Sequence, residues 1–328
     1  MKRRDFITLL LGGAAAWPLA GWAQQPAVPV IGFLSAVSPD GYSDRVRAFR
    51  QGLKEAGYVE GENVAVEYRW AENQLDRLPA LAAELVDRRV AVIVATGGTA
   101  PAQAAKAATT TIPIVFTVPE DPVKLGLVAG LARPGGNLTG VNFFFGELLA
   151  KRLDLLRELV PTARRIAVLV NPANPQRANV MVKEVQTETQ AMGMDTRILS
   201  AGTADEINVA FARFERERPD ALFVQPVPFF PARRVQLANL ASRYALPSSF
   251  SVRENVEAGG LMSYGPNFLV ALRETAAYVG RILRGAKPAD LPILQSTRFE
   301  LVINVQTAKM LGLAIPSALL ARADEVIE

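Results

Sequence analysis

The chain has 328 residues, of which 50% are hydrophobic. This is enough for about two domains with buried cores, and it excludes a disordered or fibrous protein. The net charge of +4 falls to +2 when residues 1–23 are set aside, and no basic run accompanies it, so the composition does not indicate nucleic-acid binding. Neither Cys nor His occurs, which excludes disulfides, thiol nucleophiles, Cys or His metal sites and a Ser-His-Asp triad. The composition leaves two classes of function, namely catalysis by carboxylates, Lys or a bound cofactor, and simple ligand binding.

Residues 1–23 have the features of a cleaved export signal. Basic residues 2–4 precede an uncharged stretch from Phe6 to Ala23, and Gly21 and Ala23 are the small residues that signal peptidase requires. The alternative is a membrane anchor, since 18 uncharged residues just reach the lower limit for a span. The pair Arg3-Arg4 resembles a twin-arginine signal, although a Sec signal can begin in the same way. We expect a mature protein in the periplasm.

From Val28 onward, short apolar runs alternate with segments of helical period. Their lengths predict buried strands of a parallel sheet. The runs of the first half are Val30–Leu34, Val64–Tyr68, Val90–Ala95, Ile112–Val118 and Leu138–Phe143. In the first helical segment Val46, Phe49 and Leu53 share one face, and Arg45 is expected to point away from it.

The second half repeats this pattern. A strand is expected at Ile166–Val170 and a helix at Ala178–Met192, which Gly193 ends just as Gly57 ends the first helix, 136 residues earlier. The chain is then expected to return to the first lobe with a helix at Leu269–Leu283, and to cross once more and end in the second lobe after a strand at Phe299–Val305. The predicted fold class is α/β, with two similar doubly wound parallel-sheet lobes and a multi-crossover hinge. Lobe 1 is expected to hold 28–142 plus about 266–297, and lobe 2 to hold 147–264 plus about 303–328.

Candidate binding residues follow from the strand ends. In open α/β sheets ligands bind beyond the carboxyl ends of the strands, so two facing lobes make a cleft there. The candidates are Ser35, Thr96, Gly97, Gly98, Thr117 and Asp121 in the first lobe, and Asn171, Gln225, Phe250 and Tyr264 in the second. The strongest signal is Thr96-Gly97-Gly98-Thr99, because glycines after a buried strand let backbone N–H groups converge on a carboxylate or phosphate. A plain tight turn is the alternative.

Other residues near the predicted cleft have two interpretations each. Asp121 either binds a cationic group or caps a helix that begins near Pro122. For Phe143, Phe144 and Phe145 at the first crossover, packing at the hinge is favoured over stacking on a ligand. Trp70, after the second strand, is expected at the cleft rim or in structural packing. Arg233-Arg234 is expected on a solvated helix face.

Several contiguous strings carry a resemblance to a known family. They are Gly52–Val64, Tyr68–Glu72, Asp76–Pro79, Asp121–Val123, Arg133–Asn137, Lys151–Leu153, Gly259–Gly265 and Ala323–Ile327. From about Val28 to the C-terminus, the chain resembles the solute-binding proteins of ABC importers in the tryptophan- and tyrosine-binding-like group. The resemblance implies a type I periplasmic binding fold with three crossovers that closes around one small solute.

The resemblance supports cleft roles for Ser35, Thr96 to Gly98, Asp121, Asn171 and the turn from Gln225 to Val227. One departure concerns specificity. Relatives often carry Asp where this chain has Val227, and an acid there would suit the ammonium group of an amino acid. Its absence favours a carboxylate or another neutral-to-anionic solute. A second departure is the segment from Val270 to Ala276, which lacks the Asp and Gly expected there.

The expected function is therefore that of an extracytoplasmic receptor of an ABC importer, which delivers a carboxylate or amino-acid-like solute to a membrane permease. We expect a monomer without cofactor, metal or nucleic-acid partner. A ligand-sensing module for a membrane receptor is the alternative, because the fold serves both roles. An enzyme using Asp121 and Lys124 is disfavoured, because no paired carboxylates and no spacing of nucleophile and base occur.

Overall fold

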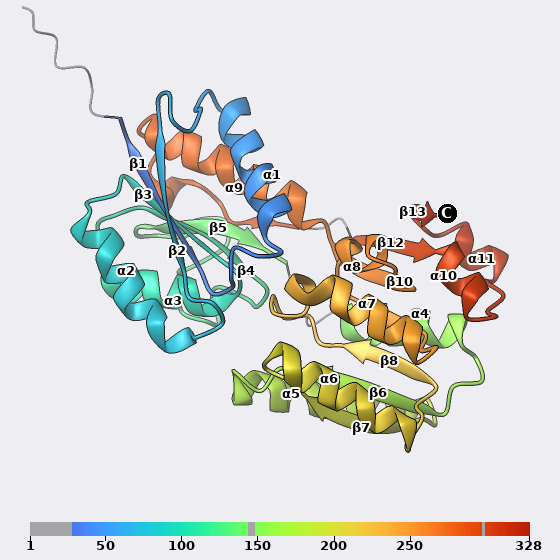
Figure 1. Ribbon diagram of the computed structural model, residues 1–328. Helices are drawn as coiled ribbons and strands as arrows, with labels where there is room; N and C mark the ends of the chain where they lie inside the picture. Colours follow the sequence, from blue (N-terminus) through green and yellow to red (C-terminus); the bar gives the residue numbers. More distant parts are fainter. Residues whose placement is uncertain (1–27, 144–147, 297–298) are drawn as a thin grey trace, which may run out of the picture.

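The computed structural model describes residues 28–143, 148–296 and 299–328, which form two α/β lobes (Figure 1). The predicted export signal at residues 1–23 and the two phenylalanines after Phe143 lie outside these ranges. Within them, no helix combines the length and apolarity that a membrane crossing requires.

Lobe 1 is built on a six-stranded sheet in the order β11-β5-β4-β3-β1-β2, with every strand pair parallel. Its elements are β1 (Val30–Ser35), α1 (Ser43–Glu55), β2 (Ala65–Trp70), α2 (Leu78–Asp87), β3 (Val92–Thr96), α3 (Thr99–Ala108), β4 (Ile114–Val118), β5 (Leu138–Asn142), α9 (Phe268–Leu283) and β11 (Leu294–Gln295). Helices α1 and α9 cover one face of the sheet, and α2 and α3 cover the other (Figure 1).

Lobe 2 is built on a seven-stranded sheet in the order β13-β12-β10-β9-β8-β6-β7. Its elements are α4 (Leu148–Leu159), β6 (Arg165–Val170), α5 (Pro175–Ala191), β7 (Asp195–Ser200), α6 (Ala204–Ala212), β8 (Ala221–Val224), α7 (Arg234–Arg243), β9 (Ser248–Phe250), α8 (Arg253–Glu257), β10 (Met262–Pro266), β12 (Phe299–Asn304), α10 (Val305–Met310), α11 (Ser317–Leu320) and β13 (Glu325–Ile327). The C-terminus lies in this lobe (Figure 1).

One strand pair departs from the expected parallel arrangement, because β12 runs antiparallel to β10, and β13 follows the direction of β12. The connections explain this difference. Strand β10 leads out of lobe 2 into α9, whereas β12 enters lobe 2 directly after β11 of lobe 1. Strand β10 therefore reaches the hinge at its C-terminal end and β12 at its N-terminal end, so the two neighbouring strands run in opposite directions.

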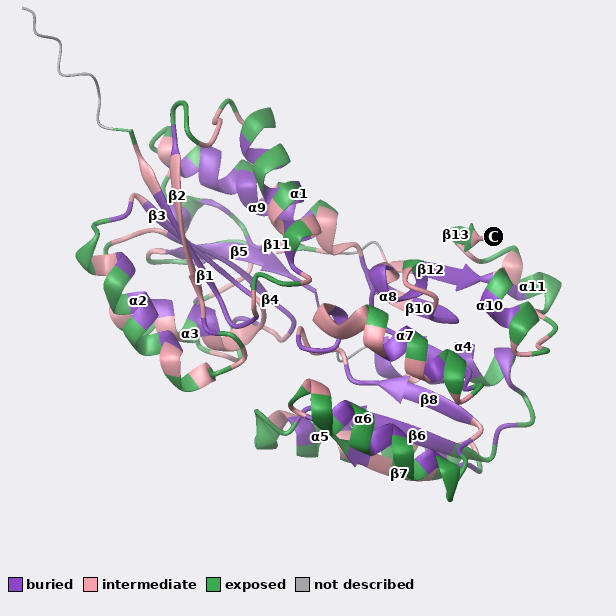
Figure 2. Cartoon of the chain, viewed as in Figure 1, coloured by how far each residue is buried: buried purple, intermediate pink, exposed green. Residues whose placement is uncertain are grey.

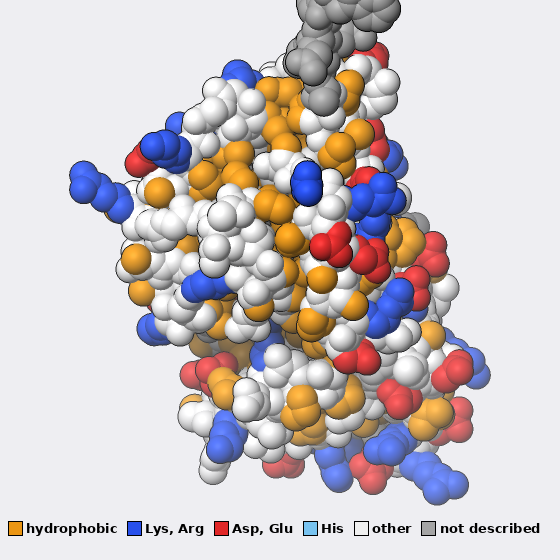
Figure 3. Space-filling model, turned by 90° about the vertical axis from the view of Figure 1, so that its left-hand side faces the viewer, with side chains coloured by type: hydrophobic (Ala, Val, Ile, Leu, Met, Phe, Trp, Pro, Cys, Tyr) orange, Lys and Arg blue, Asp and Glu red, His pale blue; other side chains and the backbone are white. Residues whose placement is uncertain are grey.

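The strands provide the buried centre of each lobe, while the outer faces of the helices are exposed (Figure 2). Strands β3, β4 and β5 are buried along their whole length, as is typical of a parallel sheet covered on both faces. In α1, Phe49 and Leu53 pack into the core as expected. Arg45 is also buried, at 5% exposure, so the prediction that it points away was wrong. Acidic and basic side chains are intermixed on the face shown in Figure 3.

The chain passes between the lobes three times in this structure, from β5 to α4, from β10 to α9 and from β11 to β12. An apolar cluster, which we call the hinge cluster, lies where these segments meet. Its members are Val141, Phe143, Leu148, Ala271, Tyr264, Phe268, Leu294 and Phe299. The rings of Phe143 and Phe268 are 4.5 Å apart, and those of Tyr264 and Phe299 are 6.2 Å apart. Phe143 therefore packs at the hinge, as the sequence favoured, and it also lines the cavity between the lobes that is described below, so both interpretations remain open.

Candidate ligand site between the lobes

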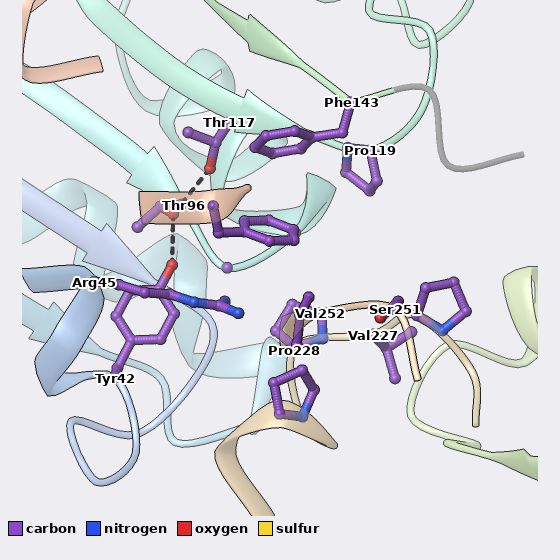
Figure 4. Close-up of a pocket in the computed structure, with 15 residues that line it drawn as sticks. Tyr42, Arg45, Thr96, Thr117, Pro119, Phe143, Val227, Pro228, Ser251 and Val252 are labelled. Carbon is purple, nitrogen blue, oxygen red and sulfur yellow. Dashed lines mark hydrogen bonds between the residues drawn. The ribbon is translucent and has the colours of Figure 1, made fainter. Parts of the chain in front are cut away.

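A cavity of about 430 Å³, a volume that includes space open to solvent, lies between the lobes, and we call it the inner cavity. Lobe 1 contributes polar groups and the glycine turn, from Tyr42, Arg45, Thr96, Gly97, Gly98 and Thr117, together with apolar surface from Pro119, Phe143 and Phe268. Lobe 2 contributes a mainly apolar wall: Pro226, Val227, Pro228, Pro231, Ser251 and Val252. Figure 4 shows labelled members of the two sets facing each other across the space. The wall residues follow or end β3, β8 and β9, or lie near the start of α1, so the strand ends position the site.

A second, larger space of about 1340 Å³ adjoins the inner cavity and opens to solvent; we call it the outer cleft. The two spaces share Gly97, Gly98, Val227 and Pro228. The lining of the outer cleft is richer in polar side chains, which include Thr99, Glu120, Asn171, Asn174, Arg177 and Gln225. The site therefore has a small apolar interior and a polar mouth.

Three hydroxyl groups form a chain along the lobe 1 wall. Thr117 donates a hydrogen bond to Thr96 Oγ1 over 2.9 Å, and Tyr42 Oη lies 2.8 Å from the same oxygen (Figure 4). The three residues come from β4, from the end of β3 and from the loop before α1, and Thr96 is only 1% exposed. This chain fixes the rotamers of the hydroxyl groups beside the cavity.

The turn from Gly97 to Gly98 requires glycine. Both residues have positive φ, +83° and +115°, and a Cβ on Gly97 would lie 2.8 Å from Ser35 Oγ. The turn leads into α3, a helix of 10 residues whose first N–H groups have no side-chain cap. Such groups carry the partial positive charge of the helix dipole, so an anion is stabilised beside them. The buried Ser35 packs behind this turn and lines neither space.

Arg45 is the charged residue of the inner cavity. Its Nε lies 3.5 Å from Glu254 Oε1 of α8 in lobe 2, and its guanidinium carbon lies 4.4 Å from the centre of the Phe268 ring. Burial alone lowers the pKa of Arg45, but Glu254 and Tyr42 raise it above its ordinary value, so the side chain is a cation. Figure 4 shows the guanidinium reaching into the space between the lobes.

Two further contacts join the lobes at the edge of the site. Arg177 of α5 pairs with Glu120 of lobe 1 over 2.6 Å, and the Thr99 hydroxyl donates to the same carboxylate. Arg234 of α7 donates to the carbonyl of Gly41 over 3.1 Å and lies 3.3 Å from Asp44 Oδ2. The expectation of a solvated helix face is therefore wrong for Arg234, because its guanidinium bridges the two lobes.

The structure brings together six of the ten candidate residues. Thr96, Gly97, Gly98 and Thr117 line the inner cavity, and Asn171 and Gln225 line the outer cleft with the two glycines. The Asn171 N–H donates to Gln225 Oε1 over 2.7 Å, which ties the two loops together.

The other four candidates lie outside both spaces. Ser35 is behind the glycine turn. Asp121 Oδ1 accepts hydrogen bonds from the N–H groups of Val123 and Lys124 and thus caps a turn. Phe250 is 1% exposed in the core of lobe 2, and Tyr264 belongs to the hinge cluster.

Trp70 packs rather than lines the cavity. It stacks with Tyr68, and its ring lies 5.7 Å from that of Tyr42, which is itself part of the wall. Trp70 is therefore one ring removed from the site. The sequence-based candidates did not include the wall residues Tyr42, Arg45, Pro119, Val252 and Phe268. For Arg45 of α1, the 3.6-residue period carries no signal that a side chain off the apolar face of the helix is buried against the other lobe.

No group of three or more Asp and Glu residues in the described part of the chain could hold a metal ion. The site offers hydrogen bonds, one cation and apolar surface. These features suit reversible binding of a small organic molecule.

Comparisons with known proteins agree with this geometry. The family model of ABC transporter substrate-binding proteins matches residues 30–327. A tyrosine-binding protein from Clostridioides difficile is 26% identical over 288 residues, which cover 88% of this chain and 82% of the relative. An ABC domain in complex with L-Trp from Streptococcus pneumoniae is 25% identical with a TM-score of 0.77, covering 91% of this chain and 99% of that one.

A second solved structure shows a related protein in another state. It is the ligand-free, open structure of a substrate-binding protein with adhesive properties from Clostridium difficile, 26% identical with a TM-score of 0.62, covering 92% of this chain and 99% of that one. LacI-family and periplasmic binding proteins share the fold at lower identity. The predicted type I periplasmic binding fold is confirmed. The matching family consists of solute-binding receptors that act outside the cytoplasm, not of enzymes, and the match over almost the whole length shows that this chain belongs to the ABC transporter substrate-binding protein family.

Proposed function

We propose that the protein is the receptor of an ABC importer, which closes its lobes around one small organic solute and delivers it to a membrane permease. The observation that carries this proposal is the inner cavity, whose two walls come from different lobes. A solute that touches both Thr96 and Val227 makes its full set of contacts only when the lobes are closed. Binding therefore shifts the population toward the closed state, which a permease can recognise.

Two observations support a closed arrangement of the lobes here. Among the residues that the structure describes, three ion pairs join the lobes: Arg45 with Glu254, Arg177 with Glu120, and Arg234 with Asp44. In addition, the TM-score is 0.77 with the L-Trp complex and 0.62 with the ligand-free, open protein, although the identities are 25% and 26%.

The proposal includes export to the periplasm as a monomer, with residues 1–23 as a twin-arginine or Sec signal. Mass analysis of the periplasmic protein is expected to give an N-terminus near Gln24. If Arg3→Lys with Arg4→Lys blocks export, the route is twin-arginine; if export continues, the route is Sec. Recovery of the full-length chain in membranes would contradict cleavage.

The solute can be identified from protein purified without added ligand. Mass spectrometry of the small molecules that denaturation releases is expected to show one organic solute in a fixed ratio to the protein. Small-angle scattering of the emptied protein, before and after this solute is returned, is expected to show a smaller radius of gyration in its presence. An unchanged scattering profile at saturation would contradict closure.

Transport needs its own test. Deletion of the gene is expected to abolish uptake of the radiolabelled solute, and the plasmid-borne gene to restore it. Normal uptake in the deletion strain, with loss of a transcriptional or chemotactic response to the solute, would overturn the transport role in favour of sensing.

A further inference from the structure

The buried charges around the inner cavity do not balance. Arg152 of α4 is 1% exposed, and its Nη2 donates to the carbonyls of Val224 and Ser249, both over 2.9 Å. Each acceptor lies two residues before a residue of the lobe 2 wall, Pro226 and Ser251, so this guanidinium is bound to the two strands, β8 and β9, that lead into that wall. The Arg152 Nε has no hydrogen-bond partner.

No carboxylate compensates this charge. Among the ion pairs of the described residues none includes Arg152, and its guanidinium carbon instead lies 4.1 Å from the centre of the Phe223 ring. Burial lowers the pKa of Arg152 to about 9, with no contribution from a neighbouring acid, so it is still protonated at neutral pH. A buried cation without an acidic partner is costly, and an anion nearby would offset part of that cost.

The opposite wall does not supply the missing negative charge. Arg45 lines the cavity, and Glu254, its partner in the ion pair, lies behind the lining. These two charges cancel, which leaves the charge of Arg152. Within the described ranges no acidic residue lines the inner cavity, and the acid of the outer cleft, Glu120, is already bound by Arg177 and Thr99.

We infer that the inner cavity selects a compact monocarboxylate with an apolar body and without an ammonium group. The carboxylate lies between the Gly97-Gly98 turn and Arg45, and the apolar body lies among the rings of Phe143 and Phe268 and the prolines and valines of lobe 2. An ammonium group would be desolvated without an acid to receive it. The inference rests on the proposed function and sharpens it, because the protein then differs in ligand class from the L-Trp complex that it resembles.

The test uses four probes that share one apolar body: phenylacetate, phenylacetamide, L-phenylalanine and phenethylamine. A second set with a branched aliphatic body, 3-methylbutanoate and its amide, L-leucine and 3-methylbutylamine, removes dependence on the phenyl ring. Calorimetric titration of the emptied mature protein is expected to show that, in at least one set, the carboxylate binds about tenfold to a hundredfold more tightly than its amide. The amino acid is expected to bind more weakly than the carboxylate, and the amine not to bind.

Two substitutions assign the selectivity to the buried guanidinium groups. Arg45→Gln and Arg152→Gln are expected to reduce the ratio of carboxylate to amide affinity about tenfold while leaving amide affinity nearly unchanged. A loss of packing alone would lower the affinities for the carboxylate and for the amide together. The ratio of the two affinities therefore distinguishes the loss of a charge from a structural defect. The matched controls are Arg47→Gln and Lys151→Gln, which alter exposed cations two residues and one residue away and are expected to keep the wild-type ratio. If Arg152→Gln does not fold, Arg152→Lys, which keeps the charge, is expected to retain the ratio.

Some outcomes overturn the inference and leave the receptor intact. If an amino acid or an amine binds more tightly than its matched carboxylate, or if carboxylate and amide bind equally, the selectivity is wrong although the protein is still a receptor. The same holds if no carboxylate binds and the solute released from the purified protein carries an ammonium group. Failure of the proposed function has a different signature, namely that the released solute produces no change in the radius of gyration.

Discussion

The two walls of the inner cavity differ in chemistry. The lobe 1 wall combines hydroxyl groups, a glycine turn and Arg45 with apolar surface from Pro119, Phe143 and Phe268, and its hydroxyl groups are held by contacts within lobe 1. The lobe 2 wall consists of three prolines and two valines, with Ser251 as its polar member. Under the proposed function, this difference assigns recognition of the polar end of the solute to lobe 1 and exclusion of water on closure to lobe 2.

This division makes different variants fail in different ways. A change in the lobe 1 wall removes hydrogen bonds that orient the solute, so it lowers affinity for every solute of the correct class. A change in the lobe 2 wall alters which solutes are accepted and how long they stay, because this wall meets the solute only in the closed state.

The largest effect is expected from Gly97→Ala. The new Cβ would meet Ser35 Oγ at 2.8 Å and the Ala36 nitrogen at 3.1 Å, at a φ of +83° that Ala rarely adopts. We expect the loss of more than about 2 kcal/mol of unfolding free energy and of measurable binding. The control is Gly193→Ala, with φ +70° and no atom within 4 Å of its Cβ, which is expected to cost only about 1 kcal/mol. Denaturant unfolding measures the unfolding free energy of the two variants, and calorimetry measures their affinity for the solute. Equal losses in Gly97→Ala and Gly193→Ala would argue against a strained wall.

Thr96→Val breaks the chain of hydroxyl groups. It leaves Tyr42 and Thr117 without their shared partner, so we expect a loss of about 1–3 kcal/mol in unfolding free energy and about tenfold weaker binding. Thr187→Val on the exposed face of α5 serves as the control and is expected to change stability by less than about 0.5 kcal/mol. Wild-type affinity in a folded Thr96→Val protein would place the solute elsewhere.

Val227→Asp reverses the character of the lobe 2 wall. An acid at this position would face the cavity near Gly98 and could pair with an ammonium group. We expect affinity for phenylacetate to fall about tenfold and binding of L-phenylalanine to rise, as titrations of both solutes would show. Val227→Asn, which is polar but neutral, is expected to lower the affinity without this exchange of specificity. The same exchange in Val227→Asn would show that polarity, and not charge, sets the preference.

Arg177→Gln is expected to have the smallest effect. The pair with Glu120 is partly exposed, with 25% and 35% of the two side chains accessible, so it contributes less than about 1 kcal/mol to closure. We expect the solute to be released several-fold faster. Stopped-flow fluorescence of Trp70, which contacts the wall residue Tyr42, measures the release rate. Arg165→Gln breaks a pair within lobe 2 and should leave release unchanged. Equal release rates in the two variants would show that the Glu120 pair does not hold the lobes together.

Local pattern predicted those parts of the site that lie on strand ends. Thr96, Gly97 and Gly98 follow from a buried apolar run that ends in a turn, and Asn171 follows in the same way from β6. Phe250 and Tyr264 meet the same criterion, yet they lie in the lobe 2 core and in the hinge cluster. The criterion identifies the correct edge of the sheet but does not show which side of it faces the other lobe.

The alternation of strands and helices, the duplicated lobes and the glycine turn could be predicted from the amino-acid sequence, because hydrophobic period and backbone φ preference are local properties. The burial of Arg45 and Arg152, the bridging role of Arg234 and the reversed direction of β12 could not, and they are visible only in the folded chain. Each of these depends on segments that are distant in sequence and meet only when the two lobes pack together. A charged residue that lies off the apolar face of one helix is solvated or buried according to what the other lobe places against it.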